Sequence, residues 1–163
     1  MKIMGVDPGT AITGFALLEV EKGSKKLLEC GVVITHDTEP MPQRLKVIAE
    51  DLDALISQHK PDWIAVEQLF FATNAKTAIT VGQARGVVLL IAAQHGLSIA
   101  EYTPLQVKQA VTGYGQATKK QVQAMVKTIL GLSEVPKPDD AADAVAIAIC
   151  HSANLKLTLP QNT

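Results

Sequence analysis

The chain has 163 residues, of which 47% are apolar and 19% are charged. This length suits a single domain with a core of its own, and the composition excludes an intrinsically disordered chain. The formal net charge of −1 excludes a chain that is basic throughout, so any polyanionic partner must be recognised by a local surface.

Three strands are predicted at the start of the chain. Runs rich in Val, Ile, Leu and Phe cover Lys2–Asp7, Thr13–Val20 and Leu27–Ile34. The turn signals PGT and EKGSKK separate these runs. Apolar runs of this length, joined by short turns, predict an antiparallel meander.

Helices and strands alternate along the next part of the chain. Apolar residues recur at helical spacing over Pro42–Lys60, and Thr77–His95 is predicted as a second helix. Short buried strands are expected at Asp62–Glu67 and Leu97–Tyr102. The second helix is apolar over most of its circumference, which indicates burial on two sides or a contact between two copies of the chain.

The remaining residues predict three more helices, at Pro104–Val111, Lys119–Leu130 and Asp140–Leu155, with the loop TGYGQAT before the second. The elements together predict an α/β domain over residues 1–155, in which helices flank a five-stranded mixed sheet. The tail Lys156–Thr163 is expected to be flexible.

No stretch approaches the ~20 apolar residues that cross a bilayer, and the apolar run at the N-terminus is too short for a signal peptide. We therefore expect a cytoplasmic protein with no membrane partner. The two cysteines, Cys30 and Cys150, lie in apolar surroundings and are expected to be reduced.

Four acids occur where the ends of elements should converge. Asp7 ends the first strand, Glu67 ends the fourth, and Asp140 and Asp143 lie three residues apart on one face of the last helix. Clustered carboxylates repel one another and need a compensating cation, and hard oxygen ligands suit Mg²⁺ or Mn²⁺. The pattern predicts a two-ion site that activates water for phosphodiester hydrolysis.

Each acid taken alone has a simpler interpretation. Asp7 before Pro-Gly suits a turn, and Glu67 suits an ordinary strand end. Either Asp139 or Asp140 suits a helix N-cap. Asp143 is harder to explain in this way, because an unpaired acid inside an apolar helix is unfavourable.

Charge is distributed unevenly along the chain. The span from Gln68 to Ser133 contains one acid, Glu101. Its six basic residues are Lys76, Arg85, Lys108, Lys119, Lys120 and Lys127. This asymmetry suggests a polyanionic partner such as nucleic acid, and all of the six except Lys127 are candidate contacts to it. A solvated face is the alternative, which we favour for Lys127.

Four blocks of the sequence, in this order, resemble the RuvC family of bacterial Holliday-junction resolvases. They are GVDPGTAITGFALLE, VEQLFFATNAKTAITVGQARGVVLL, TPLQVKQAVTGYGQATKKQVQAMV and DDAADAVAIAICH. The resemblance extends over essentially the whole chain and implies a ribonuclease-H-like fold. It also implies a Mg²⁺-dependent endodeoxyribonuclease that resolves four-way junctions in recombination and DNA repair.

The resemblance implies symmetric nicking of two strands by a homodimer, with two Mg²⁺ ions in each active site and Mn²⁺ as an alternative ion. The RuvA–RuvB branch-migration proteins are the partners that it implies. The metal-binding and catalytic acids of the family fall on Asp7, Glu67, Asp140 and Asp143. The family pattern D-A-A-D selects Asp140 rather than Asp139.

Three further residues receive roles from the resemblance. Phe70 takes the place of an aromatic residue that stacks on a base, and Lys108 and Lys119 take the places of two functional lysines. We expect Lys119 to act as a catalytic residue at the scissile phosphate, with Lys120 as the alternative. The other interpretation of Phe70 is packing in the core together with Phe71.

Parts of the sequence are also compatible with two rival functions. The segment DPGTAITG also resembles the phosphate loop of actin-like ATPases, but those proteins enclose their nucleotide between two such domains and this chain predicts one. A junction-binding module without activity, or a nuclease for RNA–DNA hybrids, is the second rival. Four clustered acids argue against the inactive module, because only catalysis requires them together.

Overall fold

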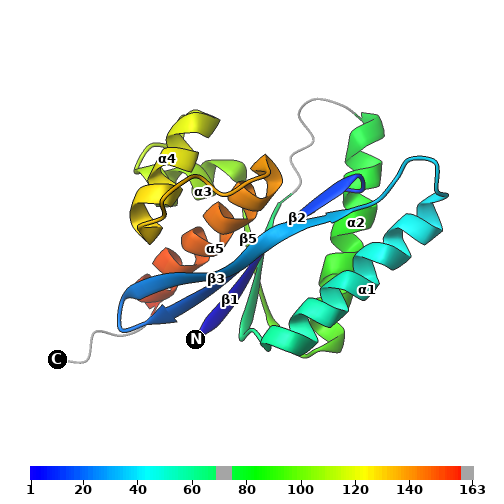
Figure 1. Cartoon of the computed structure of the whole chain (residues 1–163), viewed down its shortest axis with the longest axis horizontal. Coiled ribbons are helices and arrows are strands. Elements are labelled where there is room, and N and C mark those ends of the chain that lie inside the picture. The colour runs from blue at the N-terminus through cyan, green and yellow to red at the C-terminus, as the bar shows by residue number, and fades with distance from the viewer. Residues whose placement is uncertain (69–74, 159–163) are drawn as a thin grey trace.

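The computed structural model describes residues 1–68 and 75–158. Its centre is a five-stranded sheet in the order β3-β2-β1-β4-β5 (Figure 1). The strands are β1 (Lys2–Asp7), β2 (Ile12–Glu21), β3 (Ser24–Ile34), β4 (Trp63–Glu67) and β5 (Ser98–Tyr102). The first three are antiparallel, whereas β4 runs parallel to β1 and β5 parallel to β4. The predicted mixed sheet is confirmed.

Helices cover both faces of this sheet (Figure 1). One face carries α1 (Met41–His59) and α2 (Ala75–Gln94). The other carries α5 (Asp139–Thr158), against which α3 (Pro104–Thr112) and α4 (Lys119–Leu130) pack. Because successive side chains of a strand point to opposite faces, β1 contributes to both hydrophobic clusters.

Two glycines allow α5 to lie directly on the sheet. A Cβ atom on Gly5 would collide with the backbone oxygen of Ala144, and one on Gly14 would collide with that of Asp140. Glycine inside a strand often marks such a close approach of another backbone. Because Gly14 is paired with Asp7 across the β1–β2 ladder, this contact places the N-terminus of α5 beside the end of β1.

Most element bounds agree with the predicted ones to within two residues, with two larger differences. β3 begins at Ser24, three residues early. Lys22 and Gly23 both have positive φ, the backbone of a tight hairpin turn that lets pairing start at once. α5 continues to Thr158, into the segment predicted to be a flexible tail. Residues 159–163 lie outside the described residues.

Helix α2 differs from its prediction in two respects. The segment Thr77–Gln94 has a mean hydropathy of 1.3, and by length and composition alone it is long and apolar enough to cross a membrane. The expectation that no stretch of the chain approaches this length and hydropathy was therefore wrong. The helix is also buried on one side only within the single chain. Ala84 and Val88 lie in the core, whereas Ile79 and Leu90 are 66% and 56% exposed.

Candidate active site

The structure brings the four predicted acids to one edge of the sheet. Val6 is paired with Val66 on the parallel strands β1 and β4, so Asp7 and Glu67 come next in register. The close approach of α5 at Gly14 adds Asp140 and Asp143, two of the three acids in its first turns. All four acids therefore face a common region, although they come from distant parts of the chain.

The loop after β1 is held by hydrogen bonds on both sides. Thr13, which is buried, donates its hydroxyl hydrogen to the carbonyl of Gly9 at 2.6 Å. The hydroxyl of Thr35 donates a hydrogen bond to the carbonyl of Thr10 in this loop. The same hydroxyl accepts a hydrogen bond from Nε of Arg44 at 2.8 Å. These contacts fix the turn that ends β1, and the carboxylate of Asp7 is left at the rim of the sheet.

The acids perturb one another strongly. Burial raises the pKa of Asp7 to about 7, together with the charges of Glu67, Asp143 and Asp140, while Lys119 acts in the opposite direction. Burial and the charge of Asp143 raise the pKa of Glu67 to about 6, against the effect of two lysines. Burial is the larger cause of both shifts, and the charges of neighbouring carboxylates add to it, so ionising the whole cluster is unfavourable without a further cation.

The pKa of Asp143 is also raised, chiefly by burial, and the hydrogen bond and charge of Lys119 oppose this change. Lys119 and, at Glu67, Lys108 thus supply part of the counter-charge that the cluster needs. A divalent cation would compensate the remaining repulsion, and binding would release the protons that the raised pKa values retain.

The donor set fits the divalent metal ion that the sequence predicts. Four carboxylates offer the hard oxygen ligands that Mg²⁺ and Mn²⁺ prefer. Within residues 1–68 and 75–158, no three His, Cys, Asp or Glu side chains form a ready-made cluster that would hold an ion. We expect a bound ion to draw the carboxylates closer together, because it would offset their mutual repulsion.

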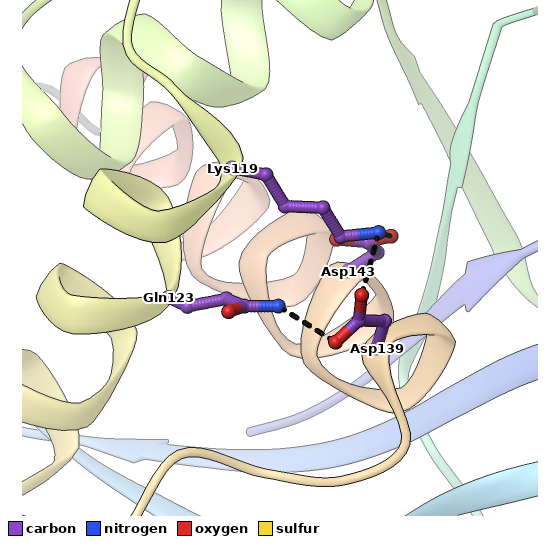
Figure 2. A network of polar contacts seen from close by, with 4 residues as sticks. All are labelled: Lys119, Gln123, Asp139 and Asp143. Atoms are coloured by element: carbon purple, nitrogen blue, oxygen red, sulfur yellow. Dashed lines mark hydrogen bonds and ion pairs between the residues drawn. The ribbon is translucent and has the colours of Figure 1, made fainter.

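Lys119 is the first residue of α4 and reaches across to α5. Its Nζ donates a hydrogen bond to Oδ2 of Asp143 at 3.0 Å and lies 3.5 Å from Oδ2 of Asp139 (Figure 2). Burial by itself would lower the pKa of Lys119, but its hydrogen bonds and charge attraction with the two aspartates outweigh that effect and raise it. Lys119 is therefore held as a cation at the site.

The other predicted basic residues occupy different positions. Lys108, on α3, lines the same pocket as Lys119 and Asp143 and acts electrostatically on Glu67. Lys120 is exposed at the second position of α4. Arg85 forms an ion pair with Glu101 of β5, so its charge already has a structural partner.

Lys76 lies in the first turn of α2, and Phe70, with its predicted role in base stacking, lies outside the described residues. The two aspartates that open α5 are placed: because the helix begins at Asp139, both Asp139 and Asp140 lie within its first turn and not at the residue before it. The N-cap interpretation of either residue is thus not supported.

Sequence reasoning did not identify Gln123 or the role of Gly14. Gln123 donates from Nε2 to Oδ1 of Asp139 at 3.0 Å. Its spacing of four residues from Lys119 on the predicted helix is a signal that both side chains share a face. Gly14 interrupts an apolar strand, and glycine at such a position signals the close approach that the structure shows.

Comparison with known proteins gives a consistent result. The family model described as crossover junction endodeoxyribonuclease RuvC matches residues 3–151. Proteins of that name from Syntrophomonas wolfei and Pelotomaculum thermopropionicum are 54% and 57% identical, covering 97% and 93% of this chain and 92% and 93% of their own. The solved structure of Thermus thermophilus RuvC with a Holliday junction substrate has a TM-score of 0.92 at 37% identity, with 96% of each chain covered. The ribonuclease-H-like α/β fold predicted from the sequence is confirmed.

Proposed function

The chain belongs to the RuvC family of crossover junction endodeoxyribonucleases, and from this premise we propose that it cuts four-way DNA junctions at its acidic sheet edge. The observation that carries the proposal is the convergence of Asp7, Glu67, Asp140 and Asp143 beside two lysines. The relative from Thermus thermophilus that was solved with a Holliday junction substrate supports the choice of a branched substrate.

We infer that the four acids hold two Mg²⁺ ions in each active site, with Mn²⁺ as an alternative. Such ions, when bound, supply activation of water and stabilisation of the departing 3′ oxygen, which leaves 5′-phosphate and 3′-hydroxyl ends. Asp7 is the proposed ligand shared by both ions, because it interacts electrostatically with all three other acids.

The two lysines complete the proposed site. Lys119 contacts the scissile phosphate and offsets the negative charge that develops on it. Lys108, on the other side of the same pocket, binds the neighbouring DNA backbone through a phosphate contact. Lys76 and Lys120 remain predicted DNA contacts, and Phe70 remains the predicted residue for base stacking. Arg85 also remains a predicted DNA contact, and in this structure its guanidinium is paired with Glu101.

The proposed active unit is a homodimer. A four-way junction presents two equivalent scissile phosphates, which suits two sites related by a two-fold axis. Ile79, Gln83, Gly86 and Leu90 recur at helical spacing on α2, and all four are exposed. These four residues form a stripe along α2. A contact between the stripes of two copies of the chain would remove Ile79 and Leu90 from water. We also propose that the protein is cytoplasmic. The RuvA–RuvB proteins remain its proposed partners.

The proposed substrate is tested by comparing three labelled DNAs under the same conditions with Mg²⁺: a four-way junction, a linear duplex of the same sequence and an RNA–DNA hybrid. We expect paired nicks in opposite strands of the junction, sealed afterwards by DNA ligase. The duplex and hybrid should remain uncut at enzyme concentrations that resolve the junction. Equal cleavage of the hybrid would contradict junction specificity.

Calorimetry with ATP, which should show no binding, tests the rival function of an ATPase.

A further inference from the structure

Asp139 lies beside the proposed metal site without belonging to its four acids. Its two oxygens have separate partners: Oδ1 accepts a hydrogen bond from Gln123 at 3.0 Å, and Oδ2 lies 3.5 Å from Nζ of Lys119 (Figure 2). The same ammonium group donates to Asp143 at 3.0 Å. Lys119 is therefore shared between one proposed metal ligand and one acid that stands outside the ligand set.

These contacts join two residues of α4 to two residues of α5, and the spacing on each helix is the same. Lys119 and Gln123 lie four residues apart on α4, and Asp139 and Asp143 lie four residues apart on α5. Residues four apart are neighbours on one helix face, so two adjacent positions of each helix meet two of the other. Asp139 is consequently fixed by Gln123 independently of the amine.

A metal ion and an ammonium group compete for the carboxylate of Asp143. When this carboxylate turns to a divalent ion, Lys119 loses its nearer partner and experiences the repulsion of a second cation. Its side chain has a flexible four-carbon stem and is half exposed, at 51%, so it could move into solvent. Only a second anion within reach would keep the amine at the site for the phosphate.

We propose that Asp139, oriented by Gln123, is a positioning residue that retains the amine of Lys119 at the active site when Asp143 binds a metal ion. This inference rests on the proposed function and deepens it, because it assigns a role to an acid outside the catalytic set. Asp139 suits this role better than metal ligation, since both of its oxygens are already engaged and its side chain is 66% exposed, against 34% for Asp143.

The test measures how fast individual lysines react with an amine-acylating reagent. The folded protein is labelled intact, and the label on each lysine is then quantified by peptide mass spectrometry. The rate at Lys119 is divided by the rate at Lys120, the adjacent exposed lysine on α4, as an internal control. Wild type, Asp139→Asn, Gln123→Ala and Asp139→Glu are compared with EDTA and with saturating Mg²⁺, all without DNA.

In EDTA, Asp139→Asn should react like wild type, because Asp143 still holds the amine. With Mg²⁺, its Lys119 rate should rise about two- to fivefold above wild type, the change that corresponds to one exposed ion pair. Gln123→Ala should shift in the same direction by less, and Asp139→Glu should restore protection. Circular dichroism and thermal unfolding confirm that each variant is folded.

An unchanged Lys119 rate in Mg²⁺-loaded Asp139→Asn would overturn the proposal. So would a tenfold or greater loss of Mg²⁺ affinity by calorimetry in that variant, since Asp139 would then be a ligand itself. Because neither readout uses DNA cleavage, failure of this inference is distinguishable from failure of the proposed function, which would appear as uncut junctions.

Discussion

Lys119 donates a hydrogen bond to Asp143 across 3.0 Å, and this contact joins the first residue of α4 to an acid in the second turn of α5. The pair connects the part of the chain that is rich in basic residues with the acidic edge of the sheet. It gives the metal-free protein a cation within a cluster whose carboxylates otherwise repel one another.

Replacing Lys119 with methionine removes the charge and keeps the length of the side chain. Because Lys119 opposes the raised pKa values of Asp7, Glu67 and Asp143, Lys119→Met should destabilise the metal-free protein at pH 8 by up to about 1 kcal/mol, the value for an exposed pair. Thermal unfolding in EDTA measures the loss. Lys120→Met, one residue along, is the matched control and should change stability little. Equal losses in the two variants would contradict the assigned counter-charge.

The ionisation of Asp7 should make the metal-free protein less stable as pH rises. Its pKa is about 7 in the folded chain against 3.8 for an unperturbed carboxyl, so the unfolded state loses its proton first. The cost is absent below about pH 4, grows between pH 4 and pH 7, and is complete above pH 7. Asp7→Asn should therefore be more stable than wild type at pH 8 in EDTA, by roughly 1–4 kcal/mol.

At pH 4 the difference between Asp7→Asn and wild type should largely vanish, because the carboxyl group is then protonated in the folded state and still partly protonated in the unfolded state. Denaturant unfolding at the two pH values measures both differences. A variant that is equally stabilised at pH 4 and pH 8 would show that the effect does not come from ionisation. Addition of Mg²⁺ should stabilise wild type at pH 8 more than the variant, since the ion binds the folded state.

Gly14→Ala should disturb both the fold and the site. The added Cβ would collide with the backbone oxygen of Asp140, and a helix backbone cannot yield as a side chain can. We expect a loss of about 1–3 kcal/mol in the free energy of unfolding and slower junction cleavage. Gly31→Ala is the control on the adjacent strand, where the added atom would meet the ring of Phe15 at 3.0 Å. It should cost less stability and leave cleavage near the wild-type rate.

The exposed apolar stripe of α2 should determine the oligomeric state. Leu90→Glu places a charge on this stripe and should convert the proposed dimer to a monomer at micromolar concentration, as measured by sedimentation velocity. Leu105→Glu, on α3, is the control, because Leu105 is exposed to a similar degree at 54% and lies away from the stripe. A monomeric wild type, or dimers in both variants, would contradict the assignment of the interface.

The sequence predicted the parts of the site that depend on where elements end. Asp7 and Glu67 terminate strands, and parallel pairing of those strands brings their ends together. Asp140 and Asp143 share a helix face because of their spacing. These relations follow from the geometry of one element or one strand pair, so residue patterns alone are enough to predict them.

Contacts between side chains of distant elements could not be predicted in the same way. Arg85 stays a predicted DNA contact, but the sequence did not predict that α2 would pack beside β5 and bring its guanidinium to Glu101. The hydrogen bond from Gln123 to Asp139 likewise depends on the packing of α4 on α5. Both outcomes depend on which helix faces lie together, and the sequence spacing of single residues does not determine that.

The central claim is that the four acids perform junction cleavage, and single-turnover cleavage by acid variants tests it most directly. Wild type, Asp7→Asn, Glu67→Gln, Asp140→Asn and Asp143→Asn are each saturated with a four-way junction, with binding verified separately by gel shift, and Mg²⁺ starts the reaction. We predict that wild type introduces paired, ligatable nicks, and that every variant binds the junction but cuts it at least about 100-fold more slowly, the scale of losing one group that stabilises the transition state. Cleavage at the wild-type rate by any of the four variants, with the junction bound, would contradict the claim.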